Sequence, residues 1–225
     1  LIMKKRIDAL VLVGSTYADV GTAGSGCEYI RKASAKIPVF LINGEVEGDN
    51  IYCVYSQDEQ AAYEAVSELI ASGRQRILFL TDSDTYSVMK KMAGYERALK
   101  ENGLPVLGEL KLCLKNQIQY VRDILLSRRT LVFDSVLATD DGLAVGAVKY
   151  AHAKGLSIPE DLAVIGYNNS EYAICCEPEL TSVDNTGEKL CSMTIDNLMK
   201  VVKGEKIPAK IPVECTLVKR CTTDF

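Results

Sequence analysis

The sequence predicts an α/β protein in which helices cover mostly parallel sheets. Short apolar runs alternate with segments of helical apolar spacing along most of the 225-residue chain. The clearest unit lies within residues 131–186, where the apolar run 136–138 precedes a helical pattern that ends at Gly155 and a second apolar run, 162–165. Polar residues follow both runs. This order of strand, helix and strand predicts parallel strands joined by a right-handed crossover.

The segments before this unit repeat the pattern. Continuous apolar runs predict strands at 7–13, 37–42, 50–55, 76–80 and 107–114. Helical spacing predicts the last turn of a helix at 1–5 and helices at 27–36, 56–72, 86–102 and 117–127. Ser56 and Glu59 form a capping-box pattern, and Gly73 and Gly103 mark helix ends. The glycine-rich segment 21–26 lacks the order of a dinucleotide fingerprint, so we interpret it as a loop.

The last part of the chain adds an amphipathic helix at 187–202, which ends before Gly204, and a terminal strand at 212–218. From residue 76 onward there are enough strands for a complete lobe, whereas the residues before 56 supply only three. Three strands are too few for a well-covered independent lobe. The sequence therefore predicts an incomplete amino-terminal lobe.

Composition narrows the class of protein. The chain has 26 Lys and Arg against 30 Asp and Glu, a net charge of −4, which argues against a surface that neutralises phosphates. No apolar run approaches the length of about 20 residues that a membrane span needs, and the start lacks a signal-peptide pattern. Eight scattered cysteines without a CxxC pair and a single histidine predict no structural metal and fit a reducing cytosol.

Three stretches carry a resemblance to a known family. They are TDDGLAVGAVKYAHAKGLSIPEDLAVIGYNN (139–169), PELTSVDN (178–185) and IPVECTLVKRCTT (211–223). Together they resemble the effector-binding domain of the lactose-repressor family of bacterial transcription regulators, which shares its fold with periplasmic sugar-binding proteins. The match can be followed through nearly all of the chain.

The resemblance implies two doubly wound parallel-sheet lobes joined by three crossovers around a central cleft. The amino-terminal lobe would comprise residues 1–55 plus 184–206, and the carboxyl-terminal lobe residues 56–183 plus 207–225. It also accounts for the low strand count, because the family's amino-terminal lobe begins with a strand–helix–strand unit, preceded by a helix-turn-helix headpiece. We therefore expect roughly 60 further residues of that lobe, and a headpiece, before Leu1, since strands and helices alternate in units of about thirty residues.

The family's ligand-binding positions fall on polar residues of this chain. Lys91 stands where Arg is usual, Asp140 where Asn is usual and Asn168 where Asp is usual. The remaining candidates are Asn43, Asn185, and Ser15 and Ser87 on facing loops. Leu114 replaces the aromatic residue that stacks on a sugar ring, and the chain contains no Trp. By resemblance, Ser87, Lys91, Asp140 and Asn168 should converge opposite Ser15, Asn43 and Asn185.

Each of these residues has a simpler interpretation. Asp140 is also a suitable helix N-cap, Lys91 is also compatible with a solvated helix position, and Asn168 and Asn169 tolerate the positive φ of a turn. The adjacent Cys175 and Cys176 fit a redox switch less well than packing near a loop.

The implied function is ligand sensing in a cytoplasmic transcription regulator. Such a domain binds a small polar effector, a sugar or a sugar-like molecule, and controls DNA binding by the headpiece; a homodimer without cofactor or membrane attachment is expected. The alternative is a solute-binding protein for transport or chemotaxis. An enzyme is disfavoured because the sequence lacks a P-loop, a dinucleotide fingerprint, a G-x-S-x-G elbow and a Cys/His pair.

Overall fold

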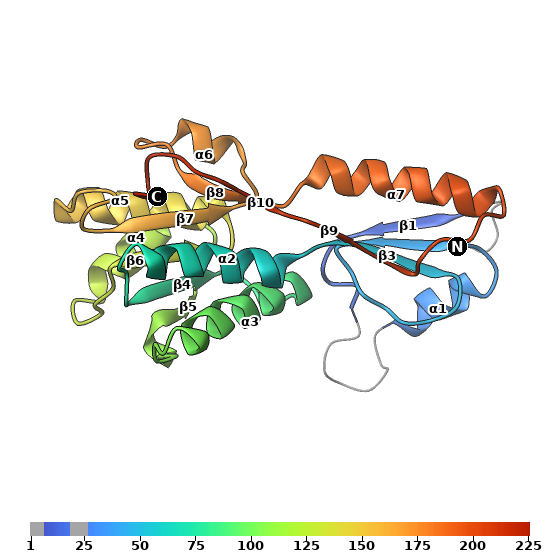
Figure 1. Cartoon of the computed structure of the whole chain (residues 1–225), viewed down its shortest axis with the longest axis horizontal. Helices are drawn as coiled ribbons and strands as arrows, with labels where there is room; N and C mark the ends of the chain where they lie inside the picture. Colours follow the sequence, from blue (N-terminus) through green and yellow to red (C-terminus); the bar gives the residue numbers. More distant parts are fainter. Residues whose placement is uncertain (1–6, 19–26) are drawn as a thin grey trace. The chain divides into compact units, whose positions relative to one another are not determined.

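A computed structural model describes residues 7–18 and 27–225 of the chain (Figure 1). The helical turn expected at 1–5 and the glycine-rich loop expected at 21–26 lie outside these residues. The chain folds as two compact units. The first unit contains residues 1–57, 85–87 and 186–214, and the second contains 58–84, 88–185 and 215–225.

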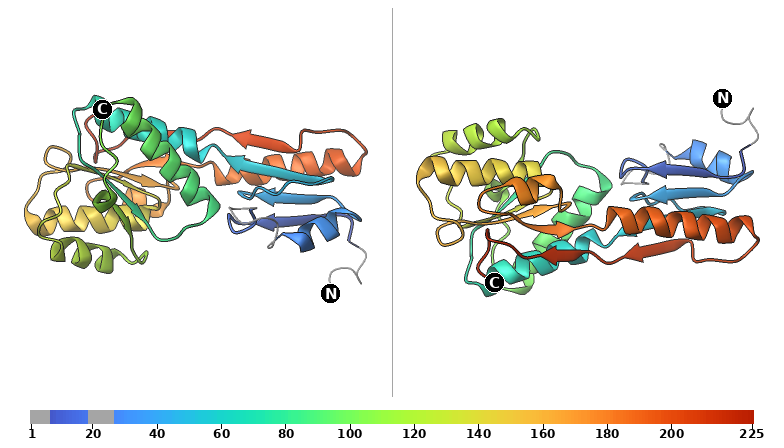
Figure 2. Two further views of the ribbon diagram at one scale, coloured as in Figure 1. Left: turned by 90° about the horizontal axis from the view of Figure 1, so that it is seen from below. Right: turned by 90° about the horizontal axis from the view of Figure 1, so that it is seen from above.

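The first unit is built on a parallel sheet that has the order β1-β2-β3-β9 among the described residues. Its strands are β1 (Leu10–Val13), β2 (Val39–Ile42), β3 (Ile51–Ser56) and β9 (Lys210–Val213). Helix α1 (Glu28–Ser34) packs Ile30 against Val39 and Leu41. Helix α7 (Gly187–Val202) runs along this sheet (Figure 2). It packs Leu190 against Ile42. Because alternate residues of a strand point to opposite faces, the two helices cover opposite faces of this sheet.

Helix α7 buries little of its apolar surface within the described residues. Of its sixteen residues only Leu190 and Thr194 are buried. Ile195, Met199 and Val202 are each about half exposed. Their spacing places these three side chains along one side of the helix.

The second unit is built on a six-stranded sheet in the order β10-β8-β7-β6-β4-β5. All neighbouring strands are parallel except β10, which runs antiparallel to β8. The strands are β4 (Ile77–Thr81), β5 (Lys111–Cys113), β6 (Ser135–Ala138), β7 (Ala163–Tyr167), β8 (Thr181–Asp184) and β10 (Thr216–Val218). The helices are α2 (Asp58–Ala71), α3 (Tyr86–Glu101, whose first two residues belong to the first unit), the 3-10 turn η2 (Gly108–Leu110), α4 (Ile118–Ser127), α5 (Asp141–Lys154) and α6 (Glu171–Cys175).

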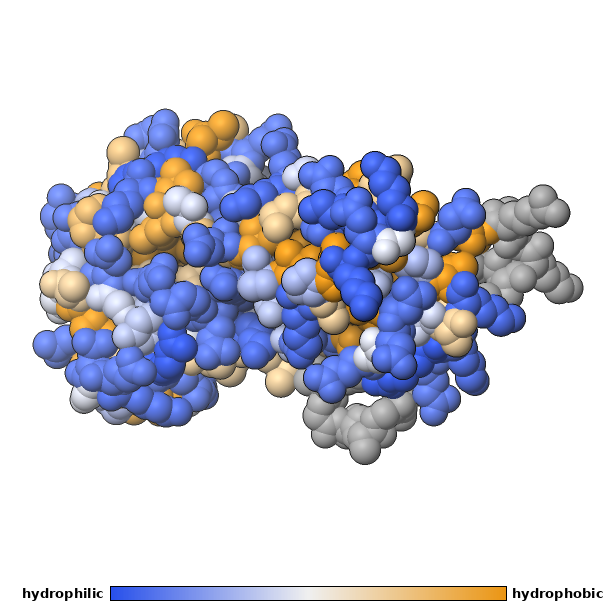
Figure 3. Space-filling view, turned by 45° about the vertical axis from the view of Figure 1, so that its right-hand side comes forward, coloured by the Kyte–Doolittle hydropathy of each residue, from blue (hydrophilic) through white to orange (hydrophobic). Residues whose placement is uncertain are grey.

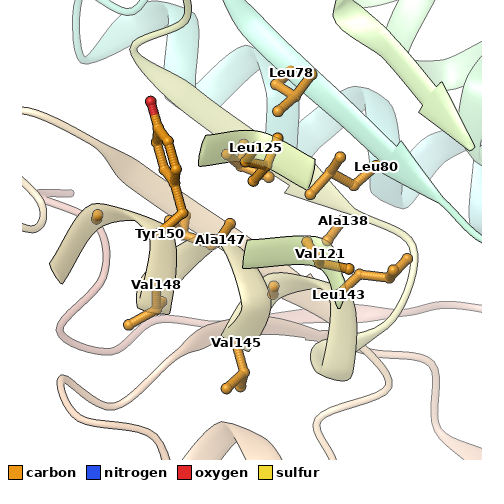
Figure 4. Packing of buried hydrophobic residues seen from close by; sticks show 14 of the residues in the cluster. Leu78, Leu80, Val121, Leu125, Ala138, Leu143, Val145, Ala147, Val148 and Tyr150 are labelled. Atoms are coloured by element: carbon orange, nitrogen blue, oxygen red, sulfur yellow. The ribbon is translucent and has the colours of Figure 1, made fainter. Parts of the chain in front are cut away.

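Helices cover both faces of this sheet. On one face, α4 and α5 pack Val121, Leu125 and Leu143 against Leu78 and Leu80 (Figure 4). On the other face, α2 and α3 pack against residues of the same strands. The rings of Phe79 in β4 and Tyr95 in α3 lie 5.1 Å apart there. This double cover explains why the central strands read as continuous apolar runs in the sequence.

Helices α2 and α3 approach each other closely at Gly94. A Cβ atom on Gly94 would lie 2.1 Å from the backbone oxygen of Glu59, so only glycine fits at this crossing. The hydroxyl of Tyr95 donates to the backbone oxygen of Ile77 at 2.9 Å, which fixes α3 on the sheet.

The terminal segment differs from the prediction. The single strand expected at 212–218 is two strands, β9 and β10. Strand β9 pairs with β3 in the first unit and β10 pairs with β8 in the second, because each completes the hydrogen bonds of a different sheet edge. Residues 207–214 therefore lie in the first unit, and not in the carboxyl-terminal lobe with the rest of 207–225.

Two further elements were not predicted. Helix α6 has only five residues, and β8 has the polar sequence TSVD. Strand β8 is buried because its hydroxyls find partners: Thr181 Oγ1 lies 2.8 Å from Thr223 Oγ1, and Ser182 Oγ donates to Asp141 Oδ1 at 2.6 Å. The segment expected as a strand at 107–114 is the η2 turn followed by the short β5.

In the described part of the chain no helix is long and apolar enough to cross a membrane. Hydrophilic residues predominate on the face drawn in Figure 3, with smaller apolar areas among them.

Candidate functional site

Four polar side chains form a hydrogen-bonded row at the carboxyl edge of the six-stranded sheet. Asn116 follows β5, Asp140 follows β6, Asn168 follows β7 and Asn185 follows β8. Asn116 Nδ2 donates to Asp140 Oδ1 at 2.8 Å, and Asn168 Nδ2 donates to Asp140 Oδ2 at 2.9 Å. Asn185 Nδ2 donates to Asn168 Oδ1 at 2.9 Å. We call these four residues the edge row. Carboxyl edges of parallel sheets are where small molecules bind in open α/β folds.

Asp140 lies at the centre of the edge row and also caps α5. Its backbone is extended, with φ −154°, and Oδ1 accepts from the backbone N–H of Gly142 at 2.8 Å. The prediction of an N-cap is therefore confirmed. The carboxylate accepts three hydrogen bonds in all, so both of its oxygens are held in defined directions.

Asn168 has the turn conformation expected of it. Its φ is 94° and that of Asn169 is 47°, in the left-handed region that asparagine tolerates better than most residues. The backbone N–H of Asn168 donates to Val183 O at 2.8 Å, which ties the end of β7 to β8. The same residue thus shapes the turn and presents its amide to Asp140.

Asp141 supports the edge row from inside the unit. It is buried, and it accepts hydrogen bonds from the Ser182 hydroxyl at 2.6 Å, the Ser170 hydroxyl at 2.8 Å and the Ser170 backbone N–H at 2.7 Å. Burial raises the pKa of Asp141, and these hydrogen bonds oppose the rise. With its oxygens occupied, Asp141 fixes the loops after β6 and β7.

Lys91 is buried on α3, with only 5% of its surface exposed, so the solvated interpretation is wrong. Its Nζ donates to the backbone oxygen of Thr139 at 3.2 Å and lies 3.7 Å from the centroid of the Tyr167 ring. Burial lowers the pKa of Lys91, while the charges of Asp58 and Asp140 oppose this. Lys91 therefore supports the end of β6 directly next to Asp140.

The other candidates divide between the units. Ser15 and Asn43 belong to the first unit, where Asn43 (φ 57°) accepts from the backbone N–H of Ser56 at 3.0 Å. Ser87 was expected with Lys91, Asp140 and Asn168, but it belongs to the first unit, because the first two residues of α3 are part of that unit. Asn185 was expected opposite Asn168, but the structure places it in the second unit beside Asn168, because Asn185 follows the carboxyl end of the neighbouring strand β8. The convergence of the two groups stays a prediction.

Asn116 is the member of the edge row that sequence reasoning missed. The family pattern directed attention to Leu114, which is buried and packs in the core instead of offering a stacking face. The sequence did indicate Asn116 by its position, because it follows an apolar run just as Asp140 and Asn168 do. That signal was weak because β5 has only three residues.

A polar pocket of about 640 Å³ adjoins the edge row within the second unit. Its walls come from the start of α4, from α5 and from α6, and include Asn116, Gln119, Tyr120, Asp140, Lys149 and Tyr172. Among the described residues no group of three or more His, Cys, Asp or Glu side chains is placed to hold a metal ion. Amides, a carboxylate and tyrosines suit a ligand with many hydroxyl groups.

Comparison with known proteins agrees with this geometry. The periplasmic binding protein-like domain family matches residues 66–223. A curated HTH-type transcriptional regulator of Lachnoclostridium phytofermentans is 40% identical over 227 residues, which is 100% of this chain and 68% of the relative. The regulator AscG of Escherichia coli is 29% identical over 172 residues, which is 74% of this chain and 51% of AscG. The chain thus spans between half and about two thirds of these relatives.

Two solved structures show the same architecture. The crystal structure of the Escherichia coli repressor AscG has a TM-score of 0.83 at 26% identity, covering 99% of this chain and 80% of that one. A sugar-binding transcriptional regulator from Escherichia coli, solved in complex with phosphate, has a TM-score of 0.82 at 26% identity, covering 99% and 79%.

Proposed function

Because the chain belongs to the lactose-repressor (LacI) family of transcriptional regulators, we propose that it senses a small polar effector, a sugar or a sugar-like molecule. The effector binds at the edge row of the second unit. Its binding controls, allosterically, how the helix-turn-helix part of the whole protein binds DNA. The observation that carries the proposal is the edge row, a line of one carboxylate and three amides at the ligand-binding edge of a parallel sheet.

The chemistry of the row supports a polyhydroxylated ligand. A hydroxyl group both donates and accepts a hydrogen bond, and carboxylates and amides together offer both functions. The carboxylate of Asp140 accepts three hydrogen bonds, which leaves acceptor capacity for a ligand hydroxyl. Lys91 lies buried next to the row, where its Nζ donates to the backbone oxygen of Thr139, the residue before Asp140.

A homodimer in the cytoplasm is the second part of the proposal. On α7, Ile195, Met199 and Val202 are each about half exposed along one side of the helix, and an exposed apolar surface is of the kind that a second copy covers. Light scattering on the whole protein at tens of micromolar should give the mass of a dimer, and a monomer would contradict this part.

The alternative, a solute-binding protein for transport or chemotaxis, shares the fold and the site chemistry. The relatives support the regulator, since those reported above are transcriptional regulators. A solute-binding protein would bind the sugar but would show no sugar-dependent DNA binding.

The test uses the whole protein with its DNA-binding part. We expect one of glucose, ribose, cellobiose or galacturonate to raise Tm. A ligand at one hundred times its Kd raises the free energy of unfolding by about 2.7 kcal/mol. In a protein of this size each kcal/mol shifts Tm by about 2–4 °C. The same sugar should change the affinity for promoter DNA in a band-shift assay. A sugar that binds without altering DNA binding favours the alternative, and a panel without any binding contradicts the proposed effector class.

A further inference from the structure

Asn116 differs from the other residues of the edge row in its origin. It precedes α4 and follows β5, and β4 lies between β5 and β6 in the sheet. Its side chain nevertheless reaches Asp140, with Nδ2 at 2.8 Å from Oδ1. Asn116 is exposed and lines the polar pocket beside Gln119 and Tyr120. It therefore joins the edge row to that pocket.

We propose that Asn116 is a further effector-binding residue. With one N–H it holds the Asp140 carboxylate, and with its carbonyl oxygen and second N–H it binds a hydroxyl group of the effector. This inference rests on the proposed function, because it assigns one more contact to the same site.

The hydrogen-bonding capacity of the amide supports this role. An asparagine side chain has two N–H donors and a carbonyl oxygen with two lone pairs. Within the described part of the chain one donor is used, by Asp140, and the exposed side chain leaves the other groups open to the pocket. An amide that presents both a donor and an acceptor can match a hydroxyl group, which is both as well.

The glycine at position 142 makes room for this amide. A Cβ atom on Gly142 would lie 2.6 Å from Asn116 Oδ1 and 3.1 Å from Asp140 Oδ1. Any side chain here displaces the end of Asn116, and the displacement is easy because that end is flexible. Gly142 is the second residue of α5, and alanine favours a helix more than glycine does. Gly142→Ala therefore moves Asn116, and Asp140 by less, without removing any polar atom, while the helix itself gains from the alanine.

The experiment measures affinity by calorimetry on the whole protein, with glucose, ribose, cellobiose and galacturonate as ligands. For the sugar that binds, Asn116→Ala should weaken binding by about 3- to 10-fold, the loss expected for a neutral hydrogen bond. Gly142→Ala should weaken it similarly without lowering Tm. The matched control is Asn102→Ala, which removes the same side chain and one hydrogen bond from the end of α3, and it should bind as the wild type does.

Deoxy analogues separate direct contact from a structural effect. One monodeoxy analogue of the bound sugar should bind the wild type and Asn116→Ala with equal affinity, because the hydroxyl that Asn116 contacts is already missing. A purely structural role would weaken every analogue by the same factor and would overturn the inference.

The failure of this inference is distinguishable from the failure of the proposed function. If Asp140→Ala loses binding while Asn116→Ala keeps wild-type affinity, Asn116 is not a binding residue and the proposed site stands. If neither variant changes affinity, or if none of the four sugars binds, the proposed site and this inference are both wrong.

Discussion

Replacement of Asp140 by alanine is the most direct perturbation of the edge row. The carboxylate accepts from Gly142, Asn116 and Asn168 at 2.8–2.9 Å, so its position before a ligand arrives is well defined. A hydrogen bond from a ligand hydroxyl to a charged group contributes about 1.5–3 kcal/mol. Since 1.4 kcal/mol corresponds to a factor of ten, Asp140→Ala should weaken effector binding by about 10- to 100-fold.

The stability of the variant requires separate treatment, because Asp140 also caps α5. Loss of an N-cap lowers the free energy of unfolding by about 1 kcal/mol. That loss lowers Tm by about 2–4 °C in a protein of this size, so the variant should remain folded. Serine is also a favourable N-cap. Asp140→Ser should therefore recover most of the Tm while it still binds the effector weakly.

Calorimetry with the bound sugar and a thermal melt followed by circular dichroism measure the two effects independently. If Asp140→Ala binds the sugar as tightly as the wild type, the carboxylate makes no contact with the effector and the site assignment is wrong. A lower Tm with unchanged affinity would assign Asp140 to helix capping alone. In either case the fold assignment is unaffected.

Three further predictions concern charge, packing and DNA. Urea titrations give the free energy of unfolding of the wild type and of Lys91→Met, and the difference between them should rise with pH between the lowered pKa of Lys91 and its ordinary value of 10.5. The reason is that the folded state releases the Lys91 proton at a lower pH than the unfolded state does. A difference that does not change with pH would contradict the buried position. Gly94→Ala should lower the free energy of unfolding by about 1–3 kcal/mol, because its Cβ would lie 2.1 Å from a backbone oxygen of α2. The control Gly108→Ala should not lower it, because a Cβ at Gly108 would have no atom within 4 Å. The 225-residue chain by itself, with net charge −4, should give no band shift with operator DNA at physiological salt, and a specific shift would show a DNA-binding surface within this chain.

The central strands could be predicted because burial on both faces leaves a simple signal. The apolar runs at 136–138 and 162–165 correspond to β6 and β7 within one or two residues. Strand β8 left no such signal. Its hydroxyls find partners in Thr223 and Asp141, and the backbone N–H of Thr181 donates to the hydroxyl of Thr222. All three partners are far away in sequence, and a local pattern cannot reveal them.

The candidate site shows the same division between local and long-range information. The positions of Asp140 and Asn168 after strands were visible in the sequence, since parallel strands place their carboxyl ends at one edge. The direction of the Lys91 side chain was not, because the inward side of α3 depends on how the helix packs against β6 and β7. Asn116 reaches Asp140 only because α4 packs on α5, which is a tertiary contact.

The exchange of carboxylate and amide within the row has a physical consequence. The family pattern places the amide after the strand that corresponds to β6 and the carboxylate after the next one, whereas here Asp140 comes first and Asn168 second. A hydrogen bond between the two positions needs one acceptor and one donor, and this chain supplies both, with Asn168 Nδ2 donating to Asp140 Oδ2. The negative charge, however, moves to the amino terminus of α5, where the helix dipole stabilises an anion. There the carboxylate also comes within reach of Asn116 and of the polar pocket, so the ligand hydroxyl that pairs with it should lie on the α4 side of the site.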